Sequence, residues 1–213
     1  MKQLVENIEA IGAHRLGPHS AVLAIHWQND VVAQDGALDP TFAEAVRSKG
    51  VIPRVGQLLN LARESGAKVI FINVVFEKDY VGLVGNNALW KMVGKSGGFV
   101  RGGKGVEVVK DLTPHPTDIV MEHGRISGFF GTELLTVLIG HGIQDVYVTG
   151  VATNVAVDHT AKDAVQLGFN TIIVDDCCAS ANDKYHEAAM MTLRVICTDV
   201  VNAAAIQGAV QAA

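Results

Sequence analysis

The sequence predicts a three-layer α/β fold built on a mostly parallel, six-stranded sheet. Short apolar runs of strand length alternate with helix-patterned segments along the chain. The runs are apolar throughout, which is typical of strands buried on both faces in a parallel sheet covered by helices. With 213 residues, 49% of them hydrophobic, the chain can bury a sizeable core. We therefore expect one domain over residues 1–213.

The expected strands and helices follow one another in a regular order. Strands are predicted at residues 20–25, 67–75, 118–121, 145–149, 171–174 and 197–200. Helices are predicted at 42–65 with an interruption near Pro53, and at 132–142, 153–168 and 183–195, and the alanine-rich tail is also expected to be helical. The polar, glycine-rich stretch 77–105 is long for a loop, and such loops usually carry function or small helices.

Composition excludes several classes of partner. The net charge is −5 and there is no long basic run, which argues against nucleic acid and anionic membranes. No apolar stretch reaches the roughly 18–20 residues of a membrane span, and residues 1–7 lack the pattern of a signal peptide. Of the three cysteines, Cys177 and Cys178 are adjacent and Cys197 is the third. A disulfide framework is therefore not expected, and a reducing cytoplasm fits.

Three segments should meet where the strands end. In such sheets the ligand crevice lies beyond the carboxyl ends of the strands. Residues 26–30 follow the first strand, 122–125 the third, and the Gly150 turn the fourth. At this turn a strand leads into a helix, so backbone N–H groups and the helix dipole converge on a spot suited to an anion or a developing oxyanion. Ala156 stands where a thiol or hydroxyl would suggest acyl transfer, and alanine cannot attack a substrate.

These segments, in this order, resemble the isochorismatase-like hydrolase family. The resemblance rests on IHWQND at 25–30, RISGFFGT at 125–132, GVATN at 150–154 and DAVQLGF at 163–169, and it extends from about residue 20 to the end. It implies a Rossmann-like α-β-α fold. It also implies a cis peptide bond between Val151 and Ala152, which in relatives shapes the oxyanion hole.

The resemblance also shows that three reactive residues of the family are replaced in this chain. The family's chemistry usually rests on an Asp, a Lys and a Cys, and these positions here hold His26, His123 and Ala156. The scaffold positions Gln28 and Ser127 match the family. Isochorismatases also lack the Cys and cleave a vinyl ether by protonation, but that mechanism keeps the Asp and the Lys. The combination in this chain indicates altered, non-covalent chemistry.

His26 and His123 are the candidate reactive groups. A histidine with a pKa near neutrality can give or take a proton, which typically contributes about 10²–10⁴-fold in rate. Two such rings facing one pocket would push their pKa values apart. Two other interpretations stay open: the rings fill space left by a lost triad, or they bind Zn²⁺ together with His159 or Glu122. Because the spacing is not a local metal motif, we expect no cofactor and no metal.

Other residues are candidates for binding the substrate. Arg125 either contacts an anionic substrate or pairs with a surface acid. The aromatic candidates either line an apolar pocket or pack in the core, and part of the long loop corresponds to a lid or pocket wall in relatives. The predicted substrate contacts are Trp27, Gln28, Asn87, Trp90, Arg125, Phe129, Val151, Ala152 and Thr153. The remaining histidines, His14, His19, His115, His141 and His186, are expected at the surface.

Three functions are consistent with this pattern. The first is a hydrolase, or a related lyase or isomerase, that acts on a small polar or aromatic molecule through His26 and His123 without a cysteine nucleophile. The second is a catalytically inactive ligand-binding protein of the same fold. The third uses Cys178 or Cys177 as a displaced nucleophile. A small-molecule partner is expected in each case, and the resemblance implies a homo-oligomer.

Overall fold

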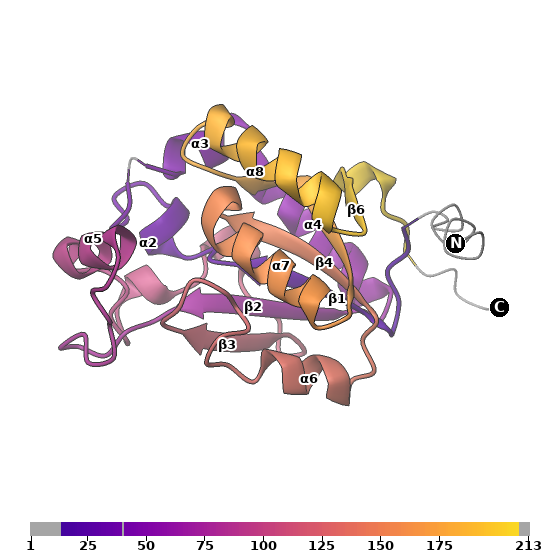
Figure 1. The fold of residues 1–213 in the computed structure, drawn as a ribbon, viewed down its shortest axis with the longest axis horizontal. Helices are drawn as coiled ribbons and strands as arrows, with labels where there is room; N and C mark the ends of the chain where they lie inside the picture. Colours follow the sequence, from indigo (N-terminus) through magenta and orange to yellow (C-terminus); the bar gives the residue numbers. More distant parts are fainter. Residues whose placement is uncertain (1–13, 40, 209–213) are drawn as a thin grey trace.

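A parallel sheet forms the centre of the computed structural model, which describes residues 14–39 and 41–208. Six strands lie in the order β3-β2-β1-β4-β5-β6, and every neighbouring pair is parallel. The strands are β1 (Ser20–Ile25), β2 (Lys68–Val74), β3 (Ile119–His123), β4 (Asp145–Val151), β5 (Asn170–Ala179) and β6 (Asp199–Val201). The α/β prediction is confirmed, and Figure 1 shows the sheet between its helices.

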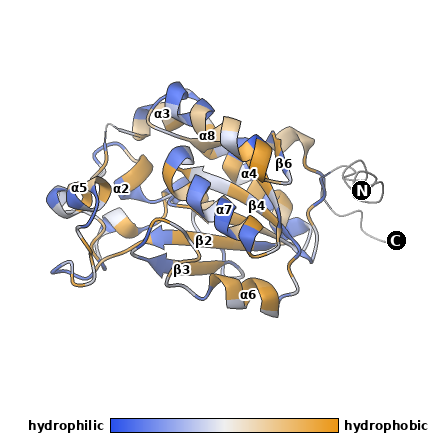
Figure 2. Ribbon diagram, viewed as in Figure 1, coloured by the Kyte–Doolittle hydropathy of each residue, from blue (hydrophilic) through white to orange (hydrophobic). Residues whose placement is uncertain are grey.

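Helices cover both faces of the sheet. On one face α4 (Val51–Glu64) packs over β1, β2 and β5, and α3 (Ala43–Ser48) contacts α4. The other face is covered by α6 (Leu134–Gly140), α7 (Asp158–Gln166) and α8 (Asp183–Ile196). Neighbouring residues of β1 point to opposite sides, so Val22 belongs to the first core cluster and Leu23 to the second. In Figure 2 the middle of β2 is hydrophobic, whereas α7 carries both kinds of residue.

The predicted helix 42–65 is interrupted near Pro53, but a glycine and not the proline makes the break. The break lies at Gly50, whose φ of 59° is left-handed, and not at Pro53. Glycine adopts this conformation without the penalty that a Cβ would bring. Pro53 lies in the first turn of α4, where the missing N–H has no partner to lose. The chain therefore forms two helices that meet at a glycine corner.

Two short helices lie at the end of the sheet toward which β2 and β3 point (Figure 1). They are α2 (Asn29–Val32) and α5 (Ala88–Ser96), and α5 lies within the long segment 77–105, as expected of a loop of that length. The segment also contains the 3-10 turn η1 (Lys104–Val106), and η2 (Lys110–Leu112) follows it. This segment closes over the carboxyl ends of the strands and forms one wall of the site described below.

The C-terminal part differs in detail from the prediction. β5 extends through Ala179, beyond the expected end at residue 174, and its pairing with β4 shifts register between Val148 and Gly150. The described part of the tail forms only the 3-10 turn η4 (Ala203–Ala205), and residues 209–213 lie outside the described residues. The signal-peptide prediction falls on residues 1–7, which also lie outside them. Within the described ranges, no helix is both long and apolar enough to cross a bilayer.

Candidate functional site

A small cavity lies at the carboxyl edge of the sheet. Its volume is about 50 Å³, and it is bounded by the ends of β1, β2 and β4, by α5 and by the segment that follows β3. His26, Trp90 and Arg125 contribute to its wall, together with Ala152 and Ala156. Most of the remaining wall is aliphatic or aromatic. The cavity is therefore an apolar space with few polar groups, as in small-molecule sites, but it is much smaller than the roughly 300–1,000 Å³ that such sites usually have.

His26 and His123 meet beside this cavity. His26 directly follows β1 and has a φ of 57°, a left-handed conformation in which histidine is enriched among non-glycine residues. His123 is the last residue of β3, and its register partner on the intervening strand is Val74. The two Nε2 atoms are 2.8 Å apart, and both rings are buried. Only His26 lies on the cavity wall, so His123 stands behind it.

Two backbone contacts compete for the protons of the neutral pair. His123 Nδ1 lies 3.2 Å from the carbonyl oxygen of Ser127, which can only accept a hydrogen bond. A hydrogen bond with the Val151 backbone favours a proton on His26 in the same way. The 2.8 Å contact between the two Nε2 atoms needs one proton, so the second proton of a neutral pair lies on only one of the two Nδ1 atoms. When it lies on His123, His26 donates from Nε2, and its Nδ1 is the basic nitrogen of the ring at the cavity.

Burial keeps both rings neutral near pH 7. The pKa of His26 is lowered well below 6.5, first by burial and then by the nearby His123, while a hydrogen bond with the backbone of Val151 acts in the opposite direction. Burial lowers the pKa of His123 from 6.5 to about 4, although its hydrogen bond to Ser127 raises it. A buried imidazole loses the hydration of its charged form, and no carboxylate is among the causes that act on either ring.

The turn after β4 brings backbone close to His26. Gly150 has a φ of 147°, and a Cβ at this position would lie 2.6 Å from the Ile25 carbonyl oxygen. Only glycine allows β4 to pass this close to the end of β1. The Val151–Ala152 peptide bond is cis, as the resemblance implied. The π-helical turn η3 (Thr153–Val157) follows, and Ala156 on it is 2% exposed and lines the cavity.

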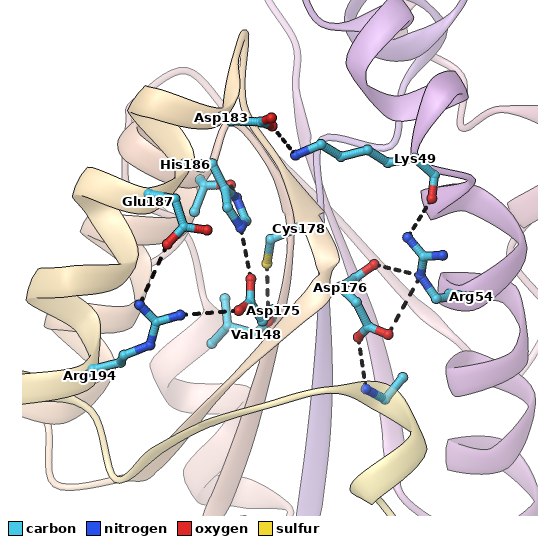
Figure 3. Close-up of polar contacts among 12 residues, drawn as sticks. Lys49, Arg54, Val148, Asp175, Asp176, Cys178, Asp183, His186, Glu187 and Arg194 are labelled. Carbon is cyan, nitrogen blue, oxygen red and sulfur yellow. Dashed lines mark hydrogen bonds and ion pairs between the residues drawn. The ribbon is translucent and has the colours of Figure 1, made fainter.

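Thr153 of this turn points away from the cavity and onto a third buried histidine. Thr153 Oγ1 lies 2.9 Å from His186 Nδ1, and His186 Nε2 lies 2.8 Å from Asp175 Oδ1. The expectation of a surface position for His186 is wrong, because this ring is 6% exposed beneath the first turn of α8. Figure 3 shows the His186–Asp175 contact, with Arg194 on the other Asp175 oxygen. The sequence around His186 contains no signal of this network, since only the fold brings its members together.

Several predicted substrate contacts do not line the cavity. Trp27 is fully buried in the core, where its indole N–H donates to Thr149 Oγ1 at 3.4 Å. Gln28 is also buried, and its amide binds backbone groups of Val74 and Val106. The ring of Phe129 stacks on Phe169, and the Asn87 side chain caps α5. None of these four side chains lines the inner cavity, whereas Asn87 borders an outer depression together with Arg125, and their contact with a substrate stays a prediction.

Comparison with known proteins identifies the family. Residues 20–205 match the model of the isochorismatase domain. This chain belongs to the isochorismatase family. It is 30% identical over 184 residues to ureidoacrylate amidohydrolase RutB of Stutzerimonas stutzeri, covering 81% of this chain and 74% of the relative.

Two solved structures share the fold. An isochorismatase family protein from Desulfovibrio vulgaris has a TM-score of 0.77 and 26% identity, over 86% of this chain and 94% of its own. The pyrazinamidase of Pyrococcus horikoshii, solved in complex with zinc, has a TM-score of 0.72 and 22% identity, over 87% of this chain and 99% of its own. At 22% identity the pyrazinamidase supports the fold alone.

In this isochorismatase-family chain the cysteines lie away from the cavity. Cys178 Sγ is 3.7 Å from the Val148 carbonyl oxygen inside the sheet. Burial raises the pKa of Cys178 well above 9 and that of Cys177 to about 12, with nearby acidic residues acting in the same direction. Both side chains are protonated near pH 7, and thiolates are the reactive form. The geometry gives no support to a displaced cysteine nucleophile.

The residues of the zinc hypothesis are also dispersed. His159 is exposed and its ring contacts the Val155 carbonyl oxygen, while the Glu122 carboxylate pairs with Arg101. Throughout the described part of the chain, no group of three or more His, Cys, Asp or Glu residues is placed to hold a metal ion. A structural or catalytic zinc site needs three or four protein ligands. The His26–His123 pair alone does not supply that set.

Proposed function

We propose that this isochorismatase-family hydrolase cleaves a small polar or aromatic molecule without a covalent intermediate, with His26 as its general base. One observation carries the proposal: His26 lies on the cavity wall, and its Nε2 is 2.8 Å from Nε2 of His123, whose Nδ1 contacts the Ser127 carbonyl. In this proposal His123 is an orienting group: with its own proton on Nδ1 it accepts from His26 Nε2 and leaves His26 Nδ1 as the base. In a Ser-His-Asp triad the aspartate orients the histidine in a similar way.

The proposed reaction uses water as the nucleophile. His26 Nδ1 takes a proton from a water molecule while the water oxygen bonds to a carbonyl carbon of the substrate. Negative charge develops on the carbonyl oxygen, next to the backbone of Ala156 at the start of the helix. The bond to the leaving group then breaks, and the leaving group takes the proton from His26. The ring returns to its neutral form, so no group on the protein is consumed.

The names of the relatives suggest which bond is cleaved. The curated relatives in Stutzerimonas stutzeri and Azorhizobium caulinodans are named ureidoacrylate amidohydrolases, which hydrolyse C–N bonds of the amide type. We extend this bond class, and not the individual substrate, to the present chain. Trp90, Val151 and Ala152 would hold the apolar part of the substrate, since they line the cavity. The expected homo-oligomer and cytoplasmic location stay predictions.

His26→Asn provides the test. Asparagine tolerates the left-handed backbone at this position, so the variant removes the base without forcing the chain into a new conformation. Release of ammonia or amine from a panel of small amides and ureido acids would be measured for both proteins. We expect kcat/KM to fall about 10²–10⁴-fold in the variant.

A matched variant separates the two histidines. His123→Gln leaves the base in place but removes the ring that orients it, so we expect a smaller loss than in His26→Asn. Equal rates for His26→Asn and the unmodified protein would disprove the assignment. Binding of panel compounds without turnover by the unmodified protein would favour the catalytically inactive ligand-binding alternative.

A further inference from the structure

The turn that follows β4 rests on a buried set of hydrogen bonds, the His186 network of Thr153, His186 and Asp175. His186 Nδ1 lies 2.9 Å from the Thr153 hydroxyl, and His186 Nε2 lies 2.8 Å from Asp175 Oδ1. Thr153 is the first residue of η3, and Ala156 in the same turn lines the cavity. The network therefore ends on the backbone segment beside the cavity, although its three side chains do not line the cavity.

The two contacts of His186 give the network a direction. An ionised carboxylate can only accept hydrogen bonds, so His186 Nε2 donates to Asp175. In the neutral ring Nδ1 then accepts, and the Thr153 hydroxyl donates to it. Arg194 lies 3.4 Å from the second oxygen of Asp175, so groups on both oxygens hold the carboxylate, as Figure 3 shows. The aspartate thus orients the imidazole, and the imidazole holds the hydroxyl in one position.

A bulge in β5 brings Asp175 into the network. While β4 advances from Val148 to Gly150, β5 advances from Ile173 to Cys178, so β5 has extra residues beside the turn. Asp175 is among these residues, and bulges commonly redirect side chains next to functional sites. The regular ladder of the sheet is interrupted at this point. Side-chain contacts, and not the ladder alone, therefore set where the backbone of the turn lies.

A second side chain of the turn has an anchor of the same kind. Ser180 directly follows β5, and its hydroxyl donates to the side-chain oxygen of Asn154. The neighbouring residues Thr153 and Asn154 are thus tied to α8 and to the end of β5. Ala152, which precedes the turn, contributes no side-chain cap. The position of η3 therefore depends on contacts that come from outside the turn.

The order of hydroxyl, imidazole and carboxylate is that of a hydrolytic triad, but the hydroxyl cannot reach a substrate. Thr153 is fully buried and lies off the cavity wall, whereas a nucleophile has to contact the substrate. The network acts instead on the backbone that follows Thr153. Hydrogen-bond donors stabilise an oxyanion best at about 2.7–3.1 Å from it, so a small displacement of the turn matters.

We propose that His186 is a positioning residue: the His186 network fixes the η3 turn and thereby directs the Ala156 backbone toward the substrate oxygen that becomes negative. The first part of this statement, that the network fixes the turn, concerns the fold and needs no turnover to be tested. The second part rests on the function proposed above. A donor directed at developing charge stabilises the transition state more than the bound substrate, so its displacement lowers kcat with little change in KM.

Substitutions at Thr153 test the second part. Thr153→Val removes the hydroxyl with little change in shape, and Thr153→Ser keeps the hydroxyl. With the panel of small amides and ureido acids, each variant would be assayed well below its own unfolding temperature. We expect Thr153→Val to lower kcat about 10–100-fold and to change KM less than about twofold. Thr153→Ser should recover most of this loss, and His186→Leu should lower kcat at least as much as Thr153→Val.

Hydrogen exchange of the amides at residues 152–157, measured by mass spectrometry, tests the first part without turnover. Exchange there should be faster in Thr153→Val than in the unmodified protein or in Thr153→Ser. Tyr147→Phe is the matched control, because it removes a hydroxyl that contacts the Arg15 carbonyl oxygen at 3.3 Å, away from the turn. This control should keep both kcat and the exchange at residues 152–157 unchanged.

Each outcome decides one part of the proposal. Unchanged exchange in Thr153→Val would overturn the first part. An unchanged kcat, a rise in KM alone, or an equal fall of kcat in Tyr147→Phe would overturn the second, the last because it would reveal a general loss of stability. If the unmodified protein turns over none of the panel compounds, the proposed function fails and the second part fails with it. The exchange measurement then still decides whether His186 holds the turn.

Discussion

Two buried histidine sites lie on either side of the η3 turn, and they differ in the group that ends each hydrogen-bond chain. His26 contacts a second imidazole, His123, and its ring borders the cavity. His186 lies between the Thr153 hydroxyl and the Asp175 carboxylate, and it lines none of the described pockets (Figure 3). Both rings are almost fully buried. Burial alone therefore does not tell a reactive histidine from a structural one.

The chemical nature of the partner makes the difference. The hydrogen bond from His186 lowers the pKa of Asp175, with Arg194 and Lys49 acting in the same direction, so this carboxylate is ionised and anchors the first turn of α8. Both nitrogens of His186 are occupied, which leaves it no free site for a substrate proton. His26 has no carboxylate partner, stays neutral and keeps one nitrogen without a proton. The first arrangement suits a structural link and the second a base.

The largest difference between the two sites should appear in the free energy of unfolding as the pH is lowered. His123 has a folded-state pKa of about 4 against 6.5 for the ordinary side chain, so the unfolded chain takes up the proton first as the pH falls. The free energy of unfolding should therefore be at its full value above pH 6.5 and should decrease between pH 6.5 and about 4. The decrease attributable to His123 is about 3 kcal/mol. Urea unfolding at a series of pH values measures it.

A double variant isolates this contribution. His26→Asn combined with His123→Gln removes both titrating rings and should flatten the stability curve in this pH range. The Asp175 carboxylate has a pKa below 3.8, so its contribution is lost only as the pH falls further, and it should remain in the double variant. A slope that persists unchanged between pH 6.5 and 4 after both substitutions would show that the rings are not neutral in the folded protein.

The next effect tests the structural role of His186. His186→Leu removes its hydrogen bonds to Thr153 and Asp175 and leaves the fully buried Thr153 hydroxyl without that partner. We expect a loss of about 2 kcal/mol in the free energy of unfolding at pH 7. His26→Asn should lose less than about 1 kcal/mol, because water in the cavity can reach the groups that the ring leaves. Comparable losses in the two variants would remove the distinction between the sites.

The sequence predicted the His26–His123 site better than the His186 site, and the reason is the topology of the sheet. The carboxyl ends of parallel strands meet at one edge, so residues that follow β1, β3 and β4 are close in space whatever the details of packing. That rule placed His26, His123 and Ala156 together. His186 lies in a helix, and its contacts with Thr153 and Asp175 depend on how α8 packs against η3, which local patterns do not determine.

Backbone conformation explains why Trp27 packs in the core. Strand alternation at the end of β1 would direct successive side chains to opposite faces of the sheet. The left-handed φ of His26 interrupts this alternation, and Trp27 turns into the core toward Thr149. Histidine gives little indication of such a conformation in a sequence, whereas glycine at Gly50 and Gly150 does. The sequence left open whether Trp27 lines a pocket or packs in the core, and the structure places it in the core.

The smallest expected effect concerns the thiols, whose modification should cause no change. Iodoacetamide at pH 7 should leave turnover unchanged, because Cys177 and Cys178 are buried away from the cavity and burial raises the pKa of Cys197 to about 11. Ala156→Cys places a single thiol on the cavity wall and serves as the positive control, with alkylation followed by intact-protein mass spectrometry. Inhibition that tracks labelling of the unmodified chain would mean that a native thiol reaches the substrate. The contrast between the two histidine sites would then no longer explain the chemistry, since a native cysteine would take part in the reaction.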